Sequence, residues 1–263
     1  MINDQSIRYK KGLGSYFFIF YIVAAVVSLV IQQIYIDVHK INYEILQNII
    51  TSGDYFHYLE EFPVTTVQII QMLSLTNFVV YSILVITLLY VLKKDFIEDA
   101  VIFKKETLNK TIKTLIIYSI IFITLNYSIN YIIYLIQGLI GYDSSSTNQI
   151  FIEVALSKAT ILTVISTVIL GPIAEELIFR KCFFGLIKNK KLALLASSLV
   201  FGFIHIISSI GSFDFLETIM LLIPYITAGI LLGLIYIKTE LNIYYVTIIH
   251  ILVNLISIIL ILI

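Results

Sequence analysis

Residues 161–187 read ILTVISTVILGPIAEELIFRKCFFGLI, a run that is apolar or weakly polar apart from Glu175, Glu176, Arg180 and Lys181. About 20 apolar residues in a helix are enough to cross the hydrocarbon core of a membrane. Each acid or arginine near the centre of such a helix costs about 2.5–3.5 kcal/mol even on the lenient insertion scale, so its presence points to a function. The run therefore predicts a membrane-spanning helix that carries a functional site.

The composition of the whole chain supports a membrane environment. Hydrophobic residues make up 59% of the 263 residues, charged residues make up 13%, and the mean hydropathy is +1.00. An average soluble domain is about 45–50% apolar and about 25% charged. Because the formal net charge is zero, no basic excess exists to neutralise phosphates, which argues against a nucleic-acid partner. The expected surroundings are the lipid bilayer.

Apolar runs of spanning length occur repeatedly along the chain. They predict an all-α fold, a polytopic membrane helical bundle of about seven transmembrane helices, with the active site within the C-terminal four. The expected spans are roughly 14–36, 71–92, 114–140, 159–187, 192–210, 216–237 and 243–263.

The lysine and arginine residues favour one orientation of these spans. If the N-terminus is cytoplasmic, the opposite side receives only Lys40 and Lys158, and its loop 37–70 is rich in acidic residues. Cytoplasmic loops carry an excess of Lys and Arg, so we expect a multi-pass protein of the cell membrane with a cytoplasmic N-terminus. The residues on the predicted cytoplasmic side are Arg8, Lys10, Lys11, Lys93, Lys94, Lys104, Lys105, Lys110, Lys113, Arg180, Lys181, Lys188, Lys190, Lys191 and Lys238.

The adjacent glutamates of the opening stretch cannot share one role. Glu176 and Arg180 are four residues apart and lie on a common helix face, so they can form an ion pair. Glu175 points about 100° away and has no partner on its own helix. Pro172 cannot donate a hydrogen bond to the carbonyl of Val168, which loosens the helix just before the glutamates. We therefore expect Glu176 and Arg180 to give structural support and Glu175 to be the working carboxylate.

Further polar residues lie at a similar depth in the last spans. Counted from the predicted cytoplasmic turns at 1.5 Å per residue, Glu175, His205 and Asn254 lie about 18–21 Å deep. His250 lies about one turn nearer the cytoplasm, on the same helix face as Asn254. The three helices are therefore expected to bring these side chains together.

The motifs Glu175-Glu176-x-x-x-Arg180, Phe201-x-x-x-His205 and His250-x-x-x-Asn254, each in its own apolar segment, resemble those of the CPBP family. This family of intramembrane proteases is also called the CAAX prenyl protease 2 or Abi family. The likeness covers roughly residues 160–258. We accordingly expect residues 155–260 to form the protease domain and residues 1–150 to form a variable N-terminal membrane part with about three transmembrane helices.

The resemblance implies an intramembrane endopeptidase that hydrolyses a peptide or membrane-protein substrate. In that family the residues equivalent to Glu175 and His205 activate a water molecule for attack on the peptide carbonyl. The residues equivalent to His250 and Asn254 stabilise the tetrahedral oxyanion, and one such donor is worth about 3–4 kcal/mol of barrier. Which substrate is cut, and whether it is prenylated, is not encoded in any residue that we can identify.

Zinc is a possible cofactor, with His205 and His250 as its candidate ligands. Family members are usually named metalloproteases, and a histidine pair with a carboxylate suits zinc. The two histidines lie on separate helices without HExxH spacing, however, and Asn254 would be a poor zinc ligand. A metal-free mechanism would use the same residues, so both alternatives stay open.

Other functions remain open. A transporter with a proton relay would need inverted repeats or paired broken helices, and neither is visible. A non-catalytic membrane partner, such as a bacteriocin self-immunity factor, is the serious rival because the family also includes such proteins. Taken singly, the polar residues could also be ordinary interhelical hydrogen bonds, each worth about 0.6–2 kcal/mol.

The charges also suggest how water reaches the site. Arg180, Lys181 and Lys188 extend polarity from Glu175 towards the cytoplasm, whereas Val168, Ile169 and other apolar residues follow in the opposite direction. We therefore expect a polar cavity that opens to the cytoplasmic face.

Overall fold

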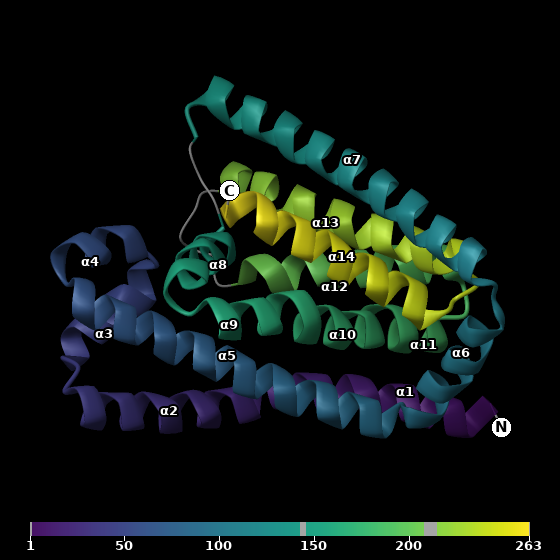
Figure 1. The fold of residues 1–263 in the computed structure, drawn as a ribbon, viewed down its shortest axis with the longest axis horizontal. Coiled ribbons are helices and arrows are strands. Elements are labelled where there is room, and N and C mark those ends of the chain that lie inside the picture. The colour runs from purple at the N-terminus through teal and green to yellow at the C-terminus, as the bar shows by residue number, and fades with distance from the viewer. Residues whose placement is uncertain (1, 143–145, 208–214, 263) are drawn as a thin grey trace.

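The computed structural model describes residues 2–142, 146–207 and 215–262, and every regular element in these ranges is helical (Figure 1). The predicted all-α membrane bundle is therefore confirmed. The helices are α1 (Ile2–Phe17), η1 (Phe18–Val23), α2 (Ala24–His39), α3 (Tyr43–Ser52), α4 (Tyr55–Glu61), α5 (Pro63–Val91), α6 (Lys93–Lys105), α7 (Leu108–Ile140), α8 (Thr147–Lys158), α9 (Thr160–Val164), η2 (Ile165–Leu170), α10 (Gly171–Glu176), η3 (Leu177–Cys182), α11 (Phe183–Leu186), α12 (Lys190–Ile206), α13 (Phe215–Lys238) and α14 (Ile243–Leu262).

Six helical segments in the described ranges are long and apolar enough to cross a membrane. They are Asp4–His39, Pro63–Val91, Leu108–Ile140, Thr160–Leu186, Phe215–Lys238 and Ile243–Leu262. The predicted count of about seven is not confirmed. The difference is α12, which has 17 residues, and the end of the span expected at 192–210 lies outside the described residues.

The long helices run roughly along one axis (Figure 1). Helices α1 and α2 pack along α5 on one flank, and α7 packs on α13 and α14 on the other flank. The run from α9 to α11 lies between these flanks (Figure 1). The short helices α3, α4 and α8 lie at one end of the bundle, and the N-terminus lies with α6 and α11 at the other (Figure 1). We call this second end the basic end, because Arg8 of α1, Lys93 and Lys94 at the start of α6, and Lys181 of η3 belong to the elements that meet there.

One hydrophobic core joins the N-terminal part of the chain to the C-terminal helices. Tyr9 and Leu88 belong to the same buried cluster as Ile178, Phe201 and Val246, among others. Removing apolar side chains from water stabilises the folded protein by about 25 cal/mol per Å² of surface. Within a membrane, only surface that would otherwise face water contributes in this way. The last helices are therefore held in place by packing against described helices of the N-terminal part as well as against one another.

Helix α12 approaches α13 closely because small residues line their crossing. A Cβ atom added at Gly202 would lie 2.6 Å from Cγ1 of Ile226, and one added at Gly229 would lie 3.0 Å from Cα of Ser198. Small residues let helix backbones approach in membranes, where van der Waals packing drives association. This crossing fixes the position of α12, which carries His205.

The helix over Thr160–Leu186 contains two π-helical segments, η2 and η3, on either side of the glutamates. The N–H of Gly171 bonds to the carbonyl of Ser166, five residues back. The next donor in that pattern would be Pro172, which has no N–H to offer Thr167. The predicted loosening of the helix before the glutamates is thus seen as a π-helical turn, a feature frequent at functional sites.

Candidate active site

Glu176 and Arg180 form the expected ion pair inside the bundle. Nε of Arg180 lies 3.0 Å from Oε2 of Glu176, and both side chains are 0% exposed. The guanidinium also lies over the ring of Phe201, with 5.7 Å between its carbon and the ring centroid. An unpaired charge at such a position would be costly, so each member of the pair compensates the other.

Glu176 has a second partner that the sequence did not predict. Its Oε1 atom lies 2.9 Å from Nδ1 of His250 on α14. The two residues are 74 positions apart, and no local spacing rule connects them. The one indication in the sequence was their depth, because the two residues lie only a few residues apart when counted from the predicted cytoplasmic turns. One carboxylate therefore joins α10 to α14.

Glu175 lies between the two histidines. Its Oε1 atom is 3.9 Å from Nε2 of His205, and its Oε2 atom is 3.9 Å from Nε2 of His250. The side chain of Glu175 is 14% exposed, that of His205 is 18% exposed and that of His250 is 8% exposed. The structure thus brings together Glu175 and His205, which the sequence placed at a common depth, and His250, which it placed about one turn away.

The partners of the Nδ1 atoms decide which ring nitrogens face Glu175. Nδ1 of His205 lies 2.7 Å from the carbonyl oxygen of Phe201, which can only accept a hydrogen bond. Nδ1 of His250 faces the carboxylate of Glu176, which accepts as well when ionised. Both Nδ1 atoms therefore carry a hydrogen, as expected when a second group orients a ring. Both Nε2 atoms are directed at Glu175.

Asn254 occupies the neighbouring turn of α14. Its side-chain amide donates to the carbonyl of Thr167 at 2.9 Å. This is the carbonyl that Pro172 cannot bond, so the asparagine supplies the missing donor and ties α14 to η2. Each Asn amide carries two hydrogens, so one hydrogen of Asn254 remains for another acceptor. Asn254 is partly exposed.

Tyr225 is a site residue that the sequence analysis missed. Its ring stacks on His205, with 4.8 Å between the centroids and 23° between the planes. Its hydroxyl lies 2.8 Å from the hydroxyl of Ser146. The only signal in the sequence was the preceding residue, Pro224, which lies inside α13. Nothing distinguished Tyr225 itself among the 18 tyrosines of the chain. His205 is thus fixed by Phe201 along the helix and by Tyr225 across it.

The side chains do not form a ready metal site. Among the residues that the structure describes, no group of three or more His, Cys, Asp or Glu side chains could hold a metal ion. His205 and His250 do converge on one carboxylate, but at the distances given above. Zinc at His205 and His250 therefore stays an untested alternative, and none of the chemical steps proposed for this site passes through a metal.

The predicted polar cavity that opens to the cytoplasmic face stays a prediction. On that side of Glu175, the side chains of Phe179, Arg180 and Cys182 are buried at 0% exposure. Arg180 forms its ion pair with Glu176 through Nε, but its Nη1 and Nη2 atoms are buried without a hydrogen-bond partner among the described residues. A cavity that reaches Glu175 would therefore be lined by residues other than these three.

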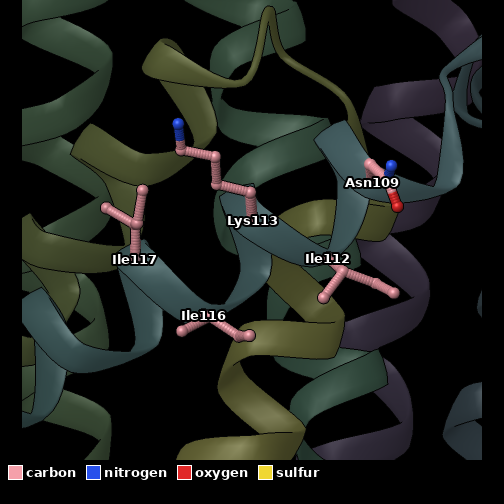
Figure 2. A pocket seen from close by; sticks show the side chains of 5 residues that line it. All are labelled: Asn109, Ile112, Lys113, Ile116 and Ile117. Carbon is pink, nitrogen blue, oxygen red and sulfur yellow. The ribbon is translucent and has the colours of Figure 1, made fainter.

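Two surface grooves lie away from these residues. One of about 440 Å³ is on α7, lined by Asn109, Ile112, Lys113, Ile116 and Ile117 (Figure 2). Another of about 570 Å³ is lined by Arg8, Tyr90, Val91, Lys93, Lys94, Ile97 and Glu98. Neither groove contains a residue of the candidate site.

Comparison with known proteins shows which family the C-terminal segment resembles. Residues 157–256 match the family model described as type II CAAX prenyl endopeptidase Rce1-like. The chain is 33% identical over 101 residues to an uncharacterized protein of Mycoplasma capricolum subsp. capricolum, covering 38% of this chain and 28% of that protein. The chain thus spans little more than a quarter of the length of this relative. No solved structure matches the chain.

The matched segment contains every residue of the site built above from Glu175, Glu176, His205, His250 and Asn254. The segment also has the helical, membrane-spanning character that the resemblance implied. Residues 157–256 therefore match a family of CAAX-type prenyl endopeptidases, which supports the resemblance to the CPBP family.

Proposed function

We propose that this protein is an intramembrane endopeptidase that hydrolyses a peptide bond of a membrane-associated or peptide substrate. The observation that carries the proposal is the position of Glu175, whose two carboxylate oxygens each lie 3.9 Å from an Nε2 atom of a histidine. Acids within membrane helices are functional by default. A family match over residues 157–256 supports the same reaction class.

Glu175 and His205 are suited to activating water. A separation of 3.9 Å is too long for a direct hydrogen bond but short enough for one water molecule to contact both atoms. That water donates one hydrogen to Glu175 and the other to the free Nε2 atom of His205. Its oxygen attacks the carbonyl carbon, and Glu175 takes the proton as general base. The proton then passes to the leaving amine as the C–N bond breaks.

His250 and Asn254 are suited to stabilising the oxyanion. In its protonated form His250 donates from Nδ1 to Glu176 and from Nε2 to the oxyanion. Asn254 offers the amide hydrogen that Thr167 does not use. With His250 protonated, Glu175, Glu176, Arg180 and His250 together carry no net charge, which suits a site of low dielectric. Preorganised donors of this kind each contribute about 3–4 kcal/mol.

The orientation of the protein belongs to the same proposal. We place the basic end at the cytoplasmic face of the cell membrane, because Lys and Arg gather there and cytoplasmic loops carry such an excess. The N-terminus lies at this end as well (Figure 1). The substrate class follows the family description, a CAAX-type prenyl endopeptidase.

A comparison of membrane peptides tests the function and does not require an identified substrate. Host cells that lack the gene would carry either the wild-type protein or Glu175→Ala at equal abundance. We expect intact precursor peptides to accumulate with Glu175→Ala and to be cut at one defined site with the wild type. Identical peptide sets, together with full biological activity of Glu175→Ala, would instead support a non-catalytic partner such as an immunity factor.

A further inference from the structure

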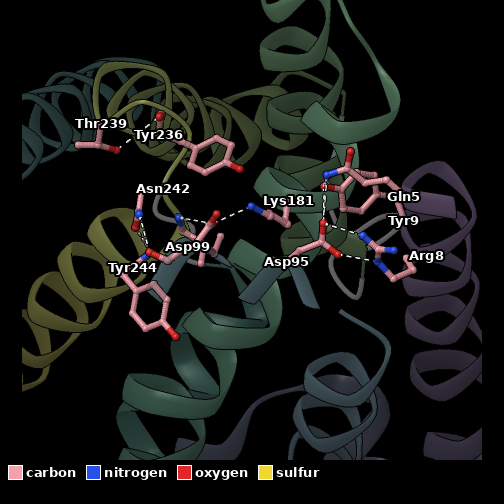
Figure 3. Close-up of polar contacts among 11 residues, drawn as sticks. Gln5, Arg8, Tyr9, Asp95, Asp99, Lys181, Tyr236, Thr239, Asn242 and Tyr244 are labelled. Carbon is pink, nitrogen blue, oxygen red and sulfur yellow. Dashed lines mark hydrogen bonds and ion pairs between the residues drawn. The ribbon is translucent and has the colours of Figure 1, made fainter. Parts of the chain in front are cut away.

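Asp99 on α6 contacts two of the helical segments that hold the candidate site, η3 and α14. Its Oδ2 atom lies 2.6 Å from Nζ of Lys181 on η3 and accepts a hydrogen bond from the backbone N–H of Ile243 at 3.0 Å (Figure 3). Its side chain is 9% exposed and that of Lys181 is 11% exposed. Asp99 lies outside the segment that matches the family model.

The hydrogen bond to Ile243 caps α14 from another helix. Ile243 is the first residue of α14, and the first N–H groups of a helix have no partner within it. A carboxylate at this position satisfies one of them and suits the positive end of the helix dipole. The backbone carbonyl of Asp99 also accepts from the side chain of Asn242 at 2.9 Å. The start of α14 is therefore fixed to α6 at two points.

Aromatic contacts extend the same face of α6. Phe96 lies 4.7 Å from Tyr244 between ring centroids, and Phe103 lies 5.4 Å from Tyr244 and 4.9 Å from Tyr245. Phe96, Asp99 and Phe103 share one helix face by their spacing. Asp99 thus lies within a packed interface between α6 and α14, and its charge is directed at Lys181.

Lys181 directly follows Arg180, which holds Glu176. On the other helix, His250 comes seven residues after Ile243, roughly 10 Å along α14. A movement of η3 relative to α14 would change the distance between Glu176 and His250, and with it the position of both histidine contacts of Glu175. One carboxylate on α6 therefore restrains two of the elements whose alignment the site needs.

We propose that Asp99 is a positioning residue that sets η3 and α14 relative to each other, so that residues outside the protease-like segment complete the catalytic geometry. This inference rests on the proposed function for its kinetic consequences. It assigns to the N-terminal part a role in alignment. It does not involve contact between Asp99 and the substrate.

The structure offers a matched control one turn away on α6. Asp95 is also buried, at 1% exposure, but it accepts hydrogen bonds from Gln5, Arg8 and Tyr9 of α1 (Figure 3). Asp95→Asn removes a buried charge from the same helix, and the hydrogen bonds that it changes lead to α1 and not to η3 or α14. Asp99→Asn keeps an oxygen for the N–H of Ile243 but loses the ion pair, and Asp99→Ala loses both contacts. Lys181→Met removes the ion pair from the other side.

The kinetic arm uses the full-length protein in lipid vesicles and a fluorogenic peptide with a farnesylated CAAX-type C-terminus. We expect kcat to fall about 10- to 100-fold in Asp99→Ala, because small misplacements of catalytic groups have effects of this size. The kcat values of Asp99→Asn and Lys181→Met should lie between those of Asp99→Ala and the wild type. The KM of each variant should stay within about twofold of the wild type. An unchanged kcat in Asp99→Ala would overturn the proposal, and so would an equal loss in Asp95→Asn.

A second arm does not depend on cleavage. With ¹⁵N-labelled histidine, the chain gives signals from four residues, and His250→Gln assigns the Nδ1 signal of His250. We expect this signal to shift in Asp99→Ala and Lys181→Met and to stay in place in Asp95→Asn. An unshifted signal in the first two would contradict the positioning role even if the peptide proved not to be a substrate. Absence of cleavage by the wild type would count against the proposed substrate class alone.

Discussion

Oε1 of Glu176 lies 2.9 Å from Nδ1 of His250, so the glutamate that pairs with Arg180 also orients a histidine of the candidate site. Both members of the Glu176–Arg180 pair are 0% exposed. The pair thus does more than compensate charge, because its loss would release His250 as well. The carboxylate of Glu176 therefore both supports the structure and positions a histidine of the candidate site.

The buried pair gives the first prediction. Arg180→Met leaves the carboxylate of Glu176 without its cation and should lower the free energy of unfolding by about 3–5 kcal/mol. The double variant Glu176→Gln/Arg180→Met removes both charges and should recover much of this stability. Unfolding of the purified protein in detergent measures both changes, with the exposed Glu60→Gln as control. Additive losses in the double variant would show that the two side chains are not coupled.

The amino-acid sequence was sufficient to predict the features that depend on local spacing. Glu176 and Arg180 are one turn apart on one helix, and counting residues placed Glu175, His205 and Asn254 at a common depth. The contact from Glu176 to His250 could not be predicted, because it depends on how α14 is rotated about its axis. Packing of α14 against its neighbouring helices sets that rotation, and spacing in the sequence does not predict it.

The number of spans in the described residues differs from the expected number for a physical reason. The count of about seven spans assumed that every apolar run reaches about 20 residues. Helix α12 begins at its Asn189 cap and has 17 residues in the described part of the chain.

The stacked ring of Tyr225 gives the second prediction. Tyr225→Phe keeps the ring on His205, so kcat should stay within about twofold of wild type. Tyr225→Leu removes a stacking contact worth about 0.5–1.5 kcal/mol, and kcat should fall by about 2- to 10-fold. Cleavage kinetics of the two variants side by side measure this. Equal rates for Phe and Leu would show that the ring does not orient His205.

The buried carboxylate of Asp95 gives the third prediction, which concerns the stability of the protein at acid pH. Burial alone would raise the pKa of Asp95, but hydrogen bonds from Arg8, Gln5 and Tyr9 hold it below its usual value. A lowered pKa in the folded state contributes stability that is present above the unfolded pKa of about 3.9 and is lost as the pH falls through the folded pKa.

Unfolding temperatures measured from neutral pH down into the acid range check this. The wild-type protein should be more stable than Asp95→Asn at neutral pH, and the difference should shrink as the pH falls below about 4. Two curves that run parallel over the whole range would contradict the role of the Asp95 charge in holding α1.

The metal content gives the fourth prediction. The described side chains form no group of three ligands, and the proposed mechanism needs only Glu175 and the histidines. We expect the purified protein to hold far less than one zinc per chain, and a strong chelator to leave kcat within about twofold. Stoichiometric zinc that disappears in both His205→Gln and His250→Gln would show that the histidines are metal ligands.

The account depends most directly on Glu175 as the general base. The decisive measurement is the cleavage rate of the farnesylated CAAX-type peptide by wild type and Glu175→Gln in lipid vesicles, with the exposed Glu60→Gln as a matched control. Loss of a general base should lower kcat by about 10²- to 10⁴-fold, with the fold intact and Glu60→Gln unaffected. Cleavage by Glu175→Gln at the wild-type rate would contradict the account.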